Sequence, residues 1–131
     1  MTLELKLAAW TLLLAFVQIL LFDFVRTAQY GAKWNMGARD ANMPPLSPIA
    51  ERLKRAQYNL FETLPLFIGA VLIAHVAGRE NPQTALGAQM YFWGRLAYVP
   101  LYAFGVPYVR SLVWVVSIFG LAKIASAILM A

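Results

Sequence analysis

The sequence predicts an all-α membrane protein, a bundle of four transmembrane helices. Of its 131 residues, 61% are hydrophobic and only 13% are charged, and the mean hydropathy is +0.63, well above that of soluble domains. Four segments are apolar over the roughly 20 residues that a helix needs to cross a bilayer. The connections between them are short, so we expect residues 1–131 to form a single membrane domain.

The first predicted helix covers about residues 3–27. Its apolar stretch resembles a signal peptide in length, but Glu4 and Lys6 give its flank no positive excess, and no small-residue cleavage site follows. We therefore expect this helix to be retained as a transmembrane span.

The second predicted helix covers about residues 48–77. The preceding loop, residues 28–48, is rich in Gly and Pro, and Ser47 and Pro48 are typical of an N-cap and a first helical position. Such a helix is about 45 Å long at 1.5 Å per residue, longer than the ~30 Å hydrocarbon layer. Its first turns are therefore expected to stand in the headgroup region or the cytoplasm.

The last two predicted helices cover about residues 83–104 and 107–130. A polar turn at residues 78–82 separates the second helix from the third, and residues 104–107, Phe-Gly-Val-Pro, are typical of a tight hairpin. We find no internal repeat in the chain.

Two rows of polar side chains interrupt these apolar segments. At about 100° per residue, each row occupies one face of its helix. The row on the second helix contains Arg52, Arg55, Asn59 and Glu62. The row on the third helix contains Tyr91, Arg95, Tyr98 and Tyr102. Because ionisable groups in a membrane helix are costly, they usually face a bundle interior and mark a functional site.

The chemistry of these rows suits a small zwitterionic ligand with more than one carboxylate. Arg52, Arg55 and Arg110 offer forked donors for carboxylates or phosphates, and Glu62 can pair with Arg95 or with an ammonium group. Such donors can also stabilise a thiolate. Two simpler interpretations stay open: Arg52 can be an interfacial cation, and Glu62 and Arg95 can be a pair that only fixes helix packing.

The sequence lacks the residues that several classes of function require. The chain has no cysteine, which excludes disulfides and a cysteine nucleophile, and the single histidine, His75, cannot form a metal centre alone. No serine–histidine pair or phosphate-binding glycine loop favours hydrolysis. The net charge of +5 does not indicate nucleic-acid binding, because the cations flank the predicted spans.

The distribution of cations predicts the orientation in the membrane. The first connection and its margins, together with the third connection, carry most of them: Arg26, Lys33, Arg39, Arg52, Lys54, Arg55 and Arg110. The opposite side has only Lys6, Arg79 and Lys123. By the positive-inside rule, the two cationic connections are cytoplasmic and both termini lie on the other side.

Two motifs resemble one known family. Residues 55–65 match the pattern Arg-Ala-Gln-x-Asn-x-x-Glu-x-x-Pro, and residues 94–98 are Gly-Arg-Leu-Ala-Tyr, followed by Tyr102 and by Arg110-Ser111. Both resemble the MAPEG family, the membrane-associated proteins in eicosanoid and glutathione metabolism, and we expect a bacterial-type member in the inner membrane. The similarity covers nearly the whole chain.

The resemblance implies a homotrimer that binds glutathione at its subunit interfaces, near the cytoplasmic surface. Arg55, Asn59 and Glu62 would hold the tripeptide, Tyr98 and Tyr102 would line the pocket beside Arg95, and Arg110 would stabilise the thiolate. Arg26 matches an arginine that some members place at the end of their first helix. No metal is expected.

The function implied is a glutathione-dependent enzyme for detoxification. It would transfer glutathione, as co-substrate, to hydrophobic electrophiles or would reduce lipid hydroperoxides from the bilayer. Tyr58 replaces an arginine of the prostaglandin-synthase branch, which disfavours an eicosanoid synthase. The alternative is a non-catalytic lipid-binding or scaffold protein of the same family. A transporter is disfavoured, because the first and last helices offer almost no polar path.

Overall fold

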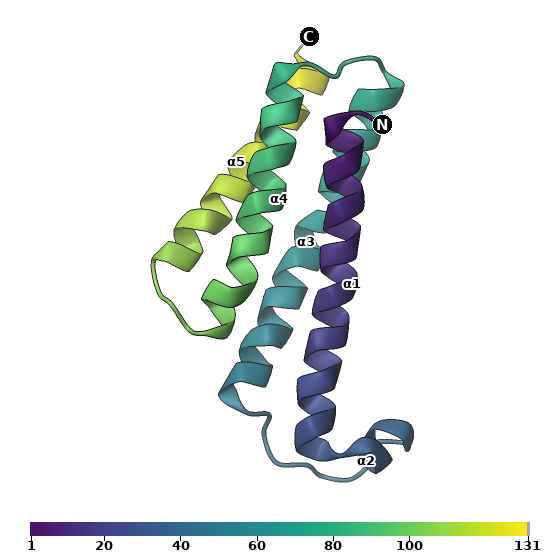
Figure 1. Cartoon of the computed structure of the whole chain (residues 1–131), viewed down its shortest axis with the longest axis vertical. Helices are drawn as coiled ribbons and strands as arrows, with labels where there is room; N and C mark the ends of the chain where they lie inside the picture. Colours follow the sequence, from purple (N-terminus) through teal and green to yellow (C-terminus); the bar gives the residue numbers. More distant parts are fainter. Residues whose placement is uncertain (131) are drawn as a thin grey trace.

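Helices make up nearly the whole chain (Figure 1). The computed structural model describes residues 1–130, and no strand occurs within them. The helices are α1 (Leu3–Tyr30), α2 (Ala32–Met36), α3 (Pro48–Val76), α4 (Pro82–Ala103) and α5 (Val109–Leu129). Both termini lie at one end of the bundle, the terminus end. The opposite end, with α2 and the connection from α4 to α5, is the hairpin end.

Local caps explain where three of the long helices begin. The Thr2 side chain accepts a hydrogen bond from the Leu5 amide at the start of α1, and Ser47 caps α3 in the same way, followed by Pro48 at the first helical position. At the start of α4, Asn81 and Thr84 bond to each other's backbone amides. Each cap satisfies amide groups that have no partner within the helix.

The first connection is more ordered than the sequence predicts. α1 continues past residue 27 to Tyr30, because the first residue that breaks the helix is Gly31, with φ of +96°. The short α2 follows directly. Gln29 then holds the remaining loop to α1: its side chain donates to the carbonyl of Pro45 at 2.9 Å and accepts from the amide of Ser47 at 2.8 Å.

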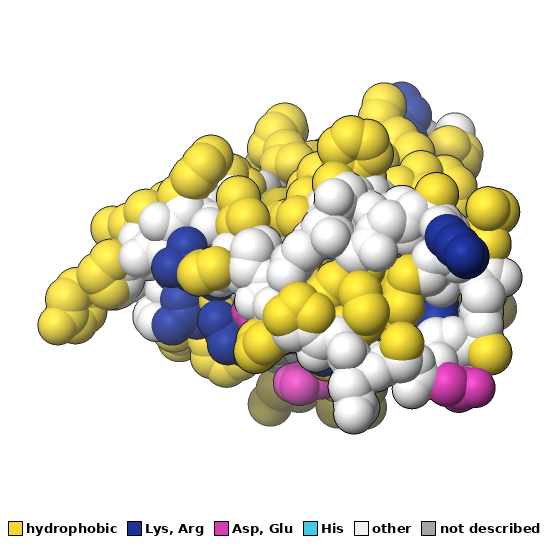
Figure 2. All heavy atoms as spheres, turned by 90° about the horizontal axis from the view of Figure 1, so that it is seen from below, with side chains coloured by type: hydrophobic (Ala, Val, Ile, Leu, Met, Phe, Trp, Pro, Cys, Tyr) yellow, Lys and Arg dark blue, Asp and Glu magenta, His cyan; other side chains and the backbone are white. Residues whose placement is uncertain are grey.

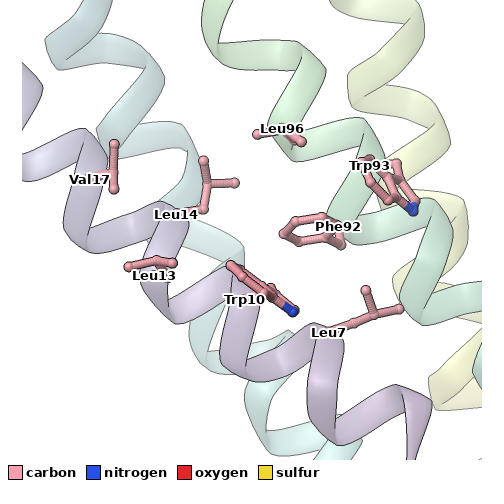
Figure 3. A pocket seen from close by; sticks show the side chains of 8 residues that line it. All are labelled: Leu7, Trp10, Leu13, Leu14, Val17, Phe92, Trp93 and Leu96. Atoms are coloured by element: carbon pink, nitrogen blue, oxygen red, sulfur yellow. The ribbon is translucent and has the colours of Figure 1, made fainter.

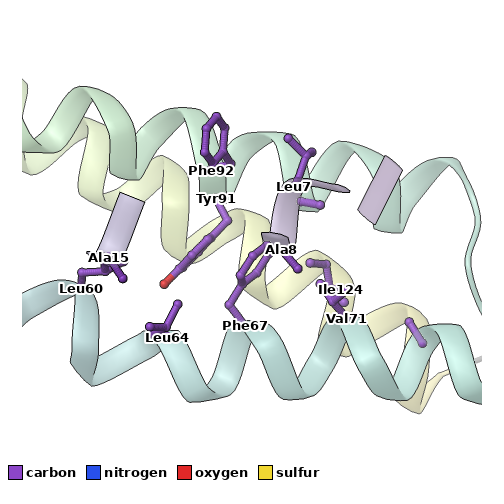
Figure 4. Close-up of a cluster of buried hydrophobic side chains, with 12 residues drawn as sticks. Leu7, Ala8, Ala15, Leu60, Leu64, Phe67, Val71, Tyr91, Phe92 and Ile124 are labelled. Carbon is purple, nitrogen blue, oxygen red and sulfur yellow. The ribbon is translucent and has the colours of Figure 1, made fainter. Parts of the chain in front are cut away.

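The core lies where α1, α3, α4 and α5 face one another (Figure 4). The rings of Phe67 on α3 and Tyr91 on α4 stack with centroids 4.0 Å apart. The Tyr91 hydroxyl also shares a hydrogen bond with Thr63 at 2.7 Å, which satisfies a buried polar group. These contacts align the polar rows of α3 and α4.

Glycines bring α4 and α5 into backbone contact, and these two helices make the most extensive contact in the bundle. A Cβ atom on Gly87 would lie 2.5 Å from the carbonyl oxygen of Gly120, and one on Gly94 would lie 2.9 Å from that of Val113. Only glycine permits this approach. The two helices therefore form one tightly packed pair.

Side-chain hydrogen bonds join the helices at the terminus end. Thr84 donates to the buried carboxylate of Glu4 at 2.7 Å, Thr2 donates to Glu80 at 2.6 Å, and Nδ1 of His75 lies 2.9 Å from the Glu80 carboxylate. The start of α1, the end of α3 and the start of α4 are thus held together by polar contacts.

Three helices, α1, α3 and α5, are long and apolar enough to cross a membrane. Large hydrophobic side chains point outward from them, including Trp10, Phe24, Leu112 and Phe119, as expected of surfaces that face lipid. α4 has 22 residues but is not among these candidate spans, because its polar row lowers its hydropathy.

Candidate functional site

Three helix ends meet at the hairpin end of the bundle: the start of α3, the end of α4 and the start of α5. Nη1 of Arg52 on α3 donates to the carbonyl of Ala103 at 3.3 Å. Its guanidinium packs against Gly105 in the hairpin, where a Cβ atom would lie 3.2 Å from the Arg52 Cζ atom. Gly105 has φ of +69°, so glycine meets both the conformational and the spatial requirement. Seen from this end, several Lys and Arg side chains gather on one side (Figure 2).

An outer cavity of about 180 Å³ opens here. Its wall combines arginines with an aromatic ring and the hairpin backbone, and it is formed by Arg52, Arg55, Tyr102, Gly105, Val106, Pro107 and Arg110. The Cζ atoms of Arg55 and Arg110 lie 5.7 Å and 4.7 Å from the centroid of the Tyr102 ring, which is within the range of cation–π attraction.

No carboxylate of residues 1–130 forms an ion pair with the arginines of this cavity. Within residues 1–130, the ion pairs are Arg26 with Asp23 and His75 with Glu80, so none of the three cavity arginines forms an ion pair with a carboxylate of these residues. Guanidinium groups bind carboxylates and phosphates in bidentate fashion. The outer cavity is therefore suited to a ligand with more than one negative charge.

An inner cavity of about 370 Å³ adjoins the outer one. Its lining is more apolar and consists of Asn59, Tyr98, Arg110, Ser111, Trp114 and Val115. Arg110 borders both cavities, and its Nη1 atom donates to the Tyr98 hydroxyl at 3.4 Å. The Oδ1 atom of Asn59 is buried and has no hydrogen-bond partner in the described chain.

Arg95 lies behind the wall of the inner cavity. It is only 1% exposed, its Cζ atom is 4.5 Å from the centroid of the Tyr98 ring, and none of its three guanidinium nitrogens has a hydrogen-bond acceptor within residues 1–130. Burying a charge without a partner lowers the stability of the fold by roughly several kcal/mol. Arg95 thus adds a fixed positive charge behind Tyr98.

The family model of the MAPEG family matches residues 7–130 of the chain. The chain belongs to the MAPEG family. A search among curated proteins finds no match. With three long apolar helices and this membership, the protein is an integral membrane protein.

The structure brings together most of the site residues predicted for this MAPEG protein. Arg55, Tyr102 and Arg110 line the outer cavity, Asn59, Tyr98 and Arg110 line the inner one, and Arg95 lies behind it.

Two predicted site residues of the MAPEG chain lie elsewhere. Glu62 is exposed on α3 and lines neither cavity. Arg26 forms an ion pair with Asp23 at 2.6 Å, and its Cζ atom is 5.5 Å from the Trp34 ring. Within one chain, therefore, neither residue takes part in the cluster around Arg110.

The structure adds three residues to the predicted site. Arg52, for which the sequence left open a role as an anion-binding donor and a role as an interfacial cation, lines the outer cavity. Ser111 and Trp114 line the inner one. Trp114 follows Arg110 by four residues, a spacing that places two side chains on one helix face, and this spacing was the available signal.

A third cavity of the MAPEG chain, larger than the inner and outer ones, is a groove of about 500 Å³ between α1 and α4 (Figure 3). It is lined by apolar side chains only: Leu7, Trp10, Leu13, Leu14, Val17, Phe92, Trp93 and Leu96. Trp93 and Leu96 lie on the face of α4 opposite its polar row. No charged group reaches this groove, so it lacks the means for polar chemistry.

Proposed function

We propose that the protein is a membrane glutathione transferase or peroxidase whose glutathione thiolate is stabilised by Arg110. The observation that carries this proposal is the position of Arg110, which borders an arginine-rich cavity on one side and a largely apolar cavity on the other. A reaction between a polyanionic thiol and a hydrophobic partner requires such a junction. Membership of the MAPEG family supports it.

Each cavity residue has a definite task in this proposal. Arg52 and Arg55 bind the carboxylates of glutathione, and Asn59 offers an amide to its backbone. The sulfur atom lies beside Arg110, whose charge favours the thiolate over the thiol and so raises the concentration of the nucleophile at neutral pH. The thiol proton leaves to water.

The second substrate is a hydrophobic electrophile or a lipid hydroperoxide from the bilayer. The apolar side of the inner cavity, formed by Trp114 and Val115, lies on α5, one of the apolar candidate spans. A lipid-soluble substrate can therefore reach Arg110 without passing through water.

We further propose that α4 is the fourth span. α3 and α5 both run from the hairpin end to the terminus end (Figure 1), so the chain between them must return across the membrane whenever these two cross it. Four crossings place both termini on one side, and the cations near the hairpin end support a cytoplasmic site.

The exposed carboxylate of Glu62 supports assembly into a homotrimer. Glu62 is exposed on a helix that is apolar enough to cross the membrane, and an ionised carboxylate facing lipid is costly. A neighbouring subunit that covers this face would remove the cost. It would also bring Glu62 to an interfacial site together with Arg26.

Calorimetry on the detergent-solubilised protein tests the proposal. Glutathione should bind, and Arg110→Ala should keep most of this binding but lose the ultraviolet absorbance of the thiolate. Arg79→Ala, at the terminus end, is the matched control and should retain both. Absence of binding heat at millimolar glutathione would refute the proposal.

The apolar groove between α1 and α4 favours a second candidate, a non-catalytic lipid-binding protein. A groove without charged groups, lined almost entirely by apolar surface, suits an acyl chain. This candidate predicts a lipid that stays bound through purification and no turnover of chlorodinitrobenzene with glutathione. Turnover that depends on Arg110 would exclude it.

A further inference from the structure

The inner cavity has one flat wall. Trp114 stands one helical turn from Arg110 on α5, and both side chains line the same cavity. An indole presents a large planar surface, and aromatic rings pack favourably on one another in offset or edge contacts. A flat ring system therefore fits this wall better than a flexible alkyl chain does.

Arg110 and Tyr98 are joined by a hydrogen bond in the wall of the inner cavity. The Tyr98 hydroxyl accepts from Arg110 at 3.4 Å, so its own hydrogen is free to donate to a ligand. Arg95 lies behind the Tyr98 ring, 4.5 Å from its centroid. Two guanidinium groups thus flank one phenol whose O–H can meet a developing negative charge.

We propose that the inner cavity is the second-substrate site and selects flat, conjugated electrophiles that carry a carbonyl oxygen, with the ring on Trp114 and the oxygen on Tyr98. This inference rests on the proposed function, since it needs the thiolate beside Arg110. It narrows the substrate class from hydrophobic electrophiles in general to aryl-conjugated enones.

Addition of glutathione to such an enone needs no reagent besides the thiol, the enone and water. The thiolate sulfur forms a bond to the β-carbon, and the electron pair of the carbon–carbon double bond moves toward the carbonyl oxygen. The resulting enolate oxygen accepts a hydrogen bond from Tyr98. Water then returns to the α-carbon the proton that the thiol had lost, so addition completes with no leaving group and no change of oxidation state overall.

The groove between α1 and α4 is the competing location for a flat hydrophobic molecule. It is larger than the inner cavity and contains two indoles, Trp10 and Trp93 (Figure 3). It contains no guanidinium group and no phenol, however, and it lies on the other face of α4, away from Arg110. The experiment must therefore distinguish Trp114 from Trp93.

A binding test needs no thiol. para-Nitrotoluene is flat, bears acceptor oxygens, does not react, and quenches tryptophan fluorescence on contact. Saturable quenching is expected in the wild-type protein and in Trp93→Phe, and it should be lost in Trp114→Phe, which keeps a ring and so should keep the fold. Quenching retained in Trp114→Phe, or absent from the wild type, would overturn the inference.

A kinetic test compares two enones at saturating glutathione. Trp114→Leu should lower kcat/KM for benzylideneacetone about tenfold, but it should change kcat/KM for an open-chain alkyl enone of equal carbon count by less than about threefold. Phe119→Leu removes an exposed ring from the same helix and should change neither. Equal losses for both enones would refute the selectivity.

The two proposals fail in distinguishable ways. Absence of glutathione binding in the calorimeter overturns the proposed function, and with it this inference. Normal glutathione binding and thiolate formation, combined with an unchanged enone preference in Trp114→Leu, overturn only the assignment of the inner cavity.

Discussion

Nη1 of Arg110 donates to the hydroxyl of Tyr98 across 3.4 Å, and this bond joins α5 to α4 at the wall that the two cavities share. The rings of Tyr98 and Tyr102 meet edge to face at 5.4 Å, and Arg110 also packs over Tyr102. The arginine is therefore held by two tyrosines one helical turn apart.

Tyr98→Phe should weaken the reaction without unfolding the protein. The ring that packs on Arg95 and Tyr102 stays, but Arg110 loses its acceptor and the substrate loses a donor. Because hydrogen bonds to charged groups are worth about 1.5–3 kcal/mol, kcat/KM should fall at least about tenfold. Tyr58→Phe, an exposed phenol on α3, is the control, and equal losses in both variants would contradict this role for Tyr98.

Arg95→Met should weaken anion binding while leaving stability unchanged or higher. The substitution removes a buried charge for which residues 1–130 supply no acceptor, and replacing such charges with apolar side chains is often neutral or stabilising. Glutathione affinity should fall several-fold, because a positive charge behind Tyr98 is lost. Calorimetry and thermal unfolding in detergent measure the two effects.

The opposite outcome for Arg95 would be equally informative. A loss of about 3 kcal/mol or more is typical of breaking a buried ion pair, and it would show that the assembled protein supplies a carboxylate. Glu62→Gln then identifies the partner: a packing pair shows mainly as lost stability, whereas a ligand contact shows mainly as lost glutathione affinity.

Gly120→Ala should destabilise the pairing of α4 with α5. The new Cβ atom would collide with the carbonyl oxygen of Gly87, and overpacking of this kind costs about 1–3 kcal/mol. Gly69→Ala is the matched control, because a Cβ atom at that helical position meets no atom within 4 Å. It should be neutral or stabilising by up to about 1 kcal/mol, and destabilisation of both variants alike would contradict the close contact.

Glu80→Gln should remove a pH-dependent part of the stability. Partial burial alone raises the pKa of Glu80. The hydrogen bonds with Thr2 and His75, together with the charge of His75, lower it by more, so the pKa lies below its ordinary 4.5. A carboxyl group with a lowered folded-state pKa stabilises the fold above its unfolded pKa, and this stabilisation is lost as pH falls through the folded pKa. Wild type should therefore unfold at a higher temperature than Glu80→Gln at pH 7, and the difference should vanish once the pH falls below the lowered pKa of Glu80. A difference that stays constant with pH would contradict the contribution of the Glu80 charge.

The helices follow from local signals in the sequence. Hydropathy and the cap at Ser47 predict where the chain is helical, since a span must satisfy its own backbone. The sequence predicts that the first helix ends near residue 27, whereas α1 ends at Tyr30. The helix continues past the charged residue Arg26 because no helix-breaking residue precedes Gly31.

The sequence predicts the buried face of α4 better than it predicts the buried face of α3. On α4, Tyr91, Arg95 and Tyr98 share one face and are all at most 1% exposed. On α3, Glu62 is about 80° from Arg52 around the helix, so it lies at the edge of its row and is exposed. Periodicity defines a stripe of residues, but the packing of neighbouring helices decides which part of it is covered.

Residues brought together by the hairpin were beyond sequence reasoning. Arg52 reaches the carbonyl of Ala103 and the backbone of Gly105, more than fifty positions along the chain. Such a contact depends on the relative position of α3 and α4 along the bundle axis, and no local sequence pattern determines that position.

The glycine contacts between α4 and α5 determine how the cavities can widen. Two helices in backbone contact move as one body, so Tyr98, Tyr102 and Arg110 keep their mutual distances when a ligand arrives. Arg55 and Asn59 lie on α3, outside this pair, and among residues 1–130 a single hydrogen bond, from Arg52 to Ala103, ties the start of α3 to the hairpin side. We therefore expect that a ligand is captured when α3 closes on this preformed wall. Spectroscopic labels should report a change in distance between α3 and α5 but none between α4 and α5.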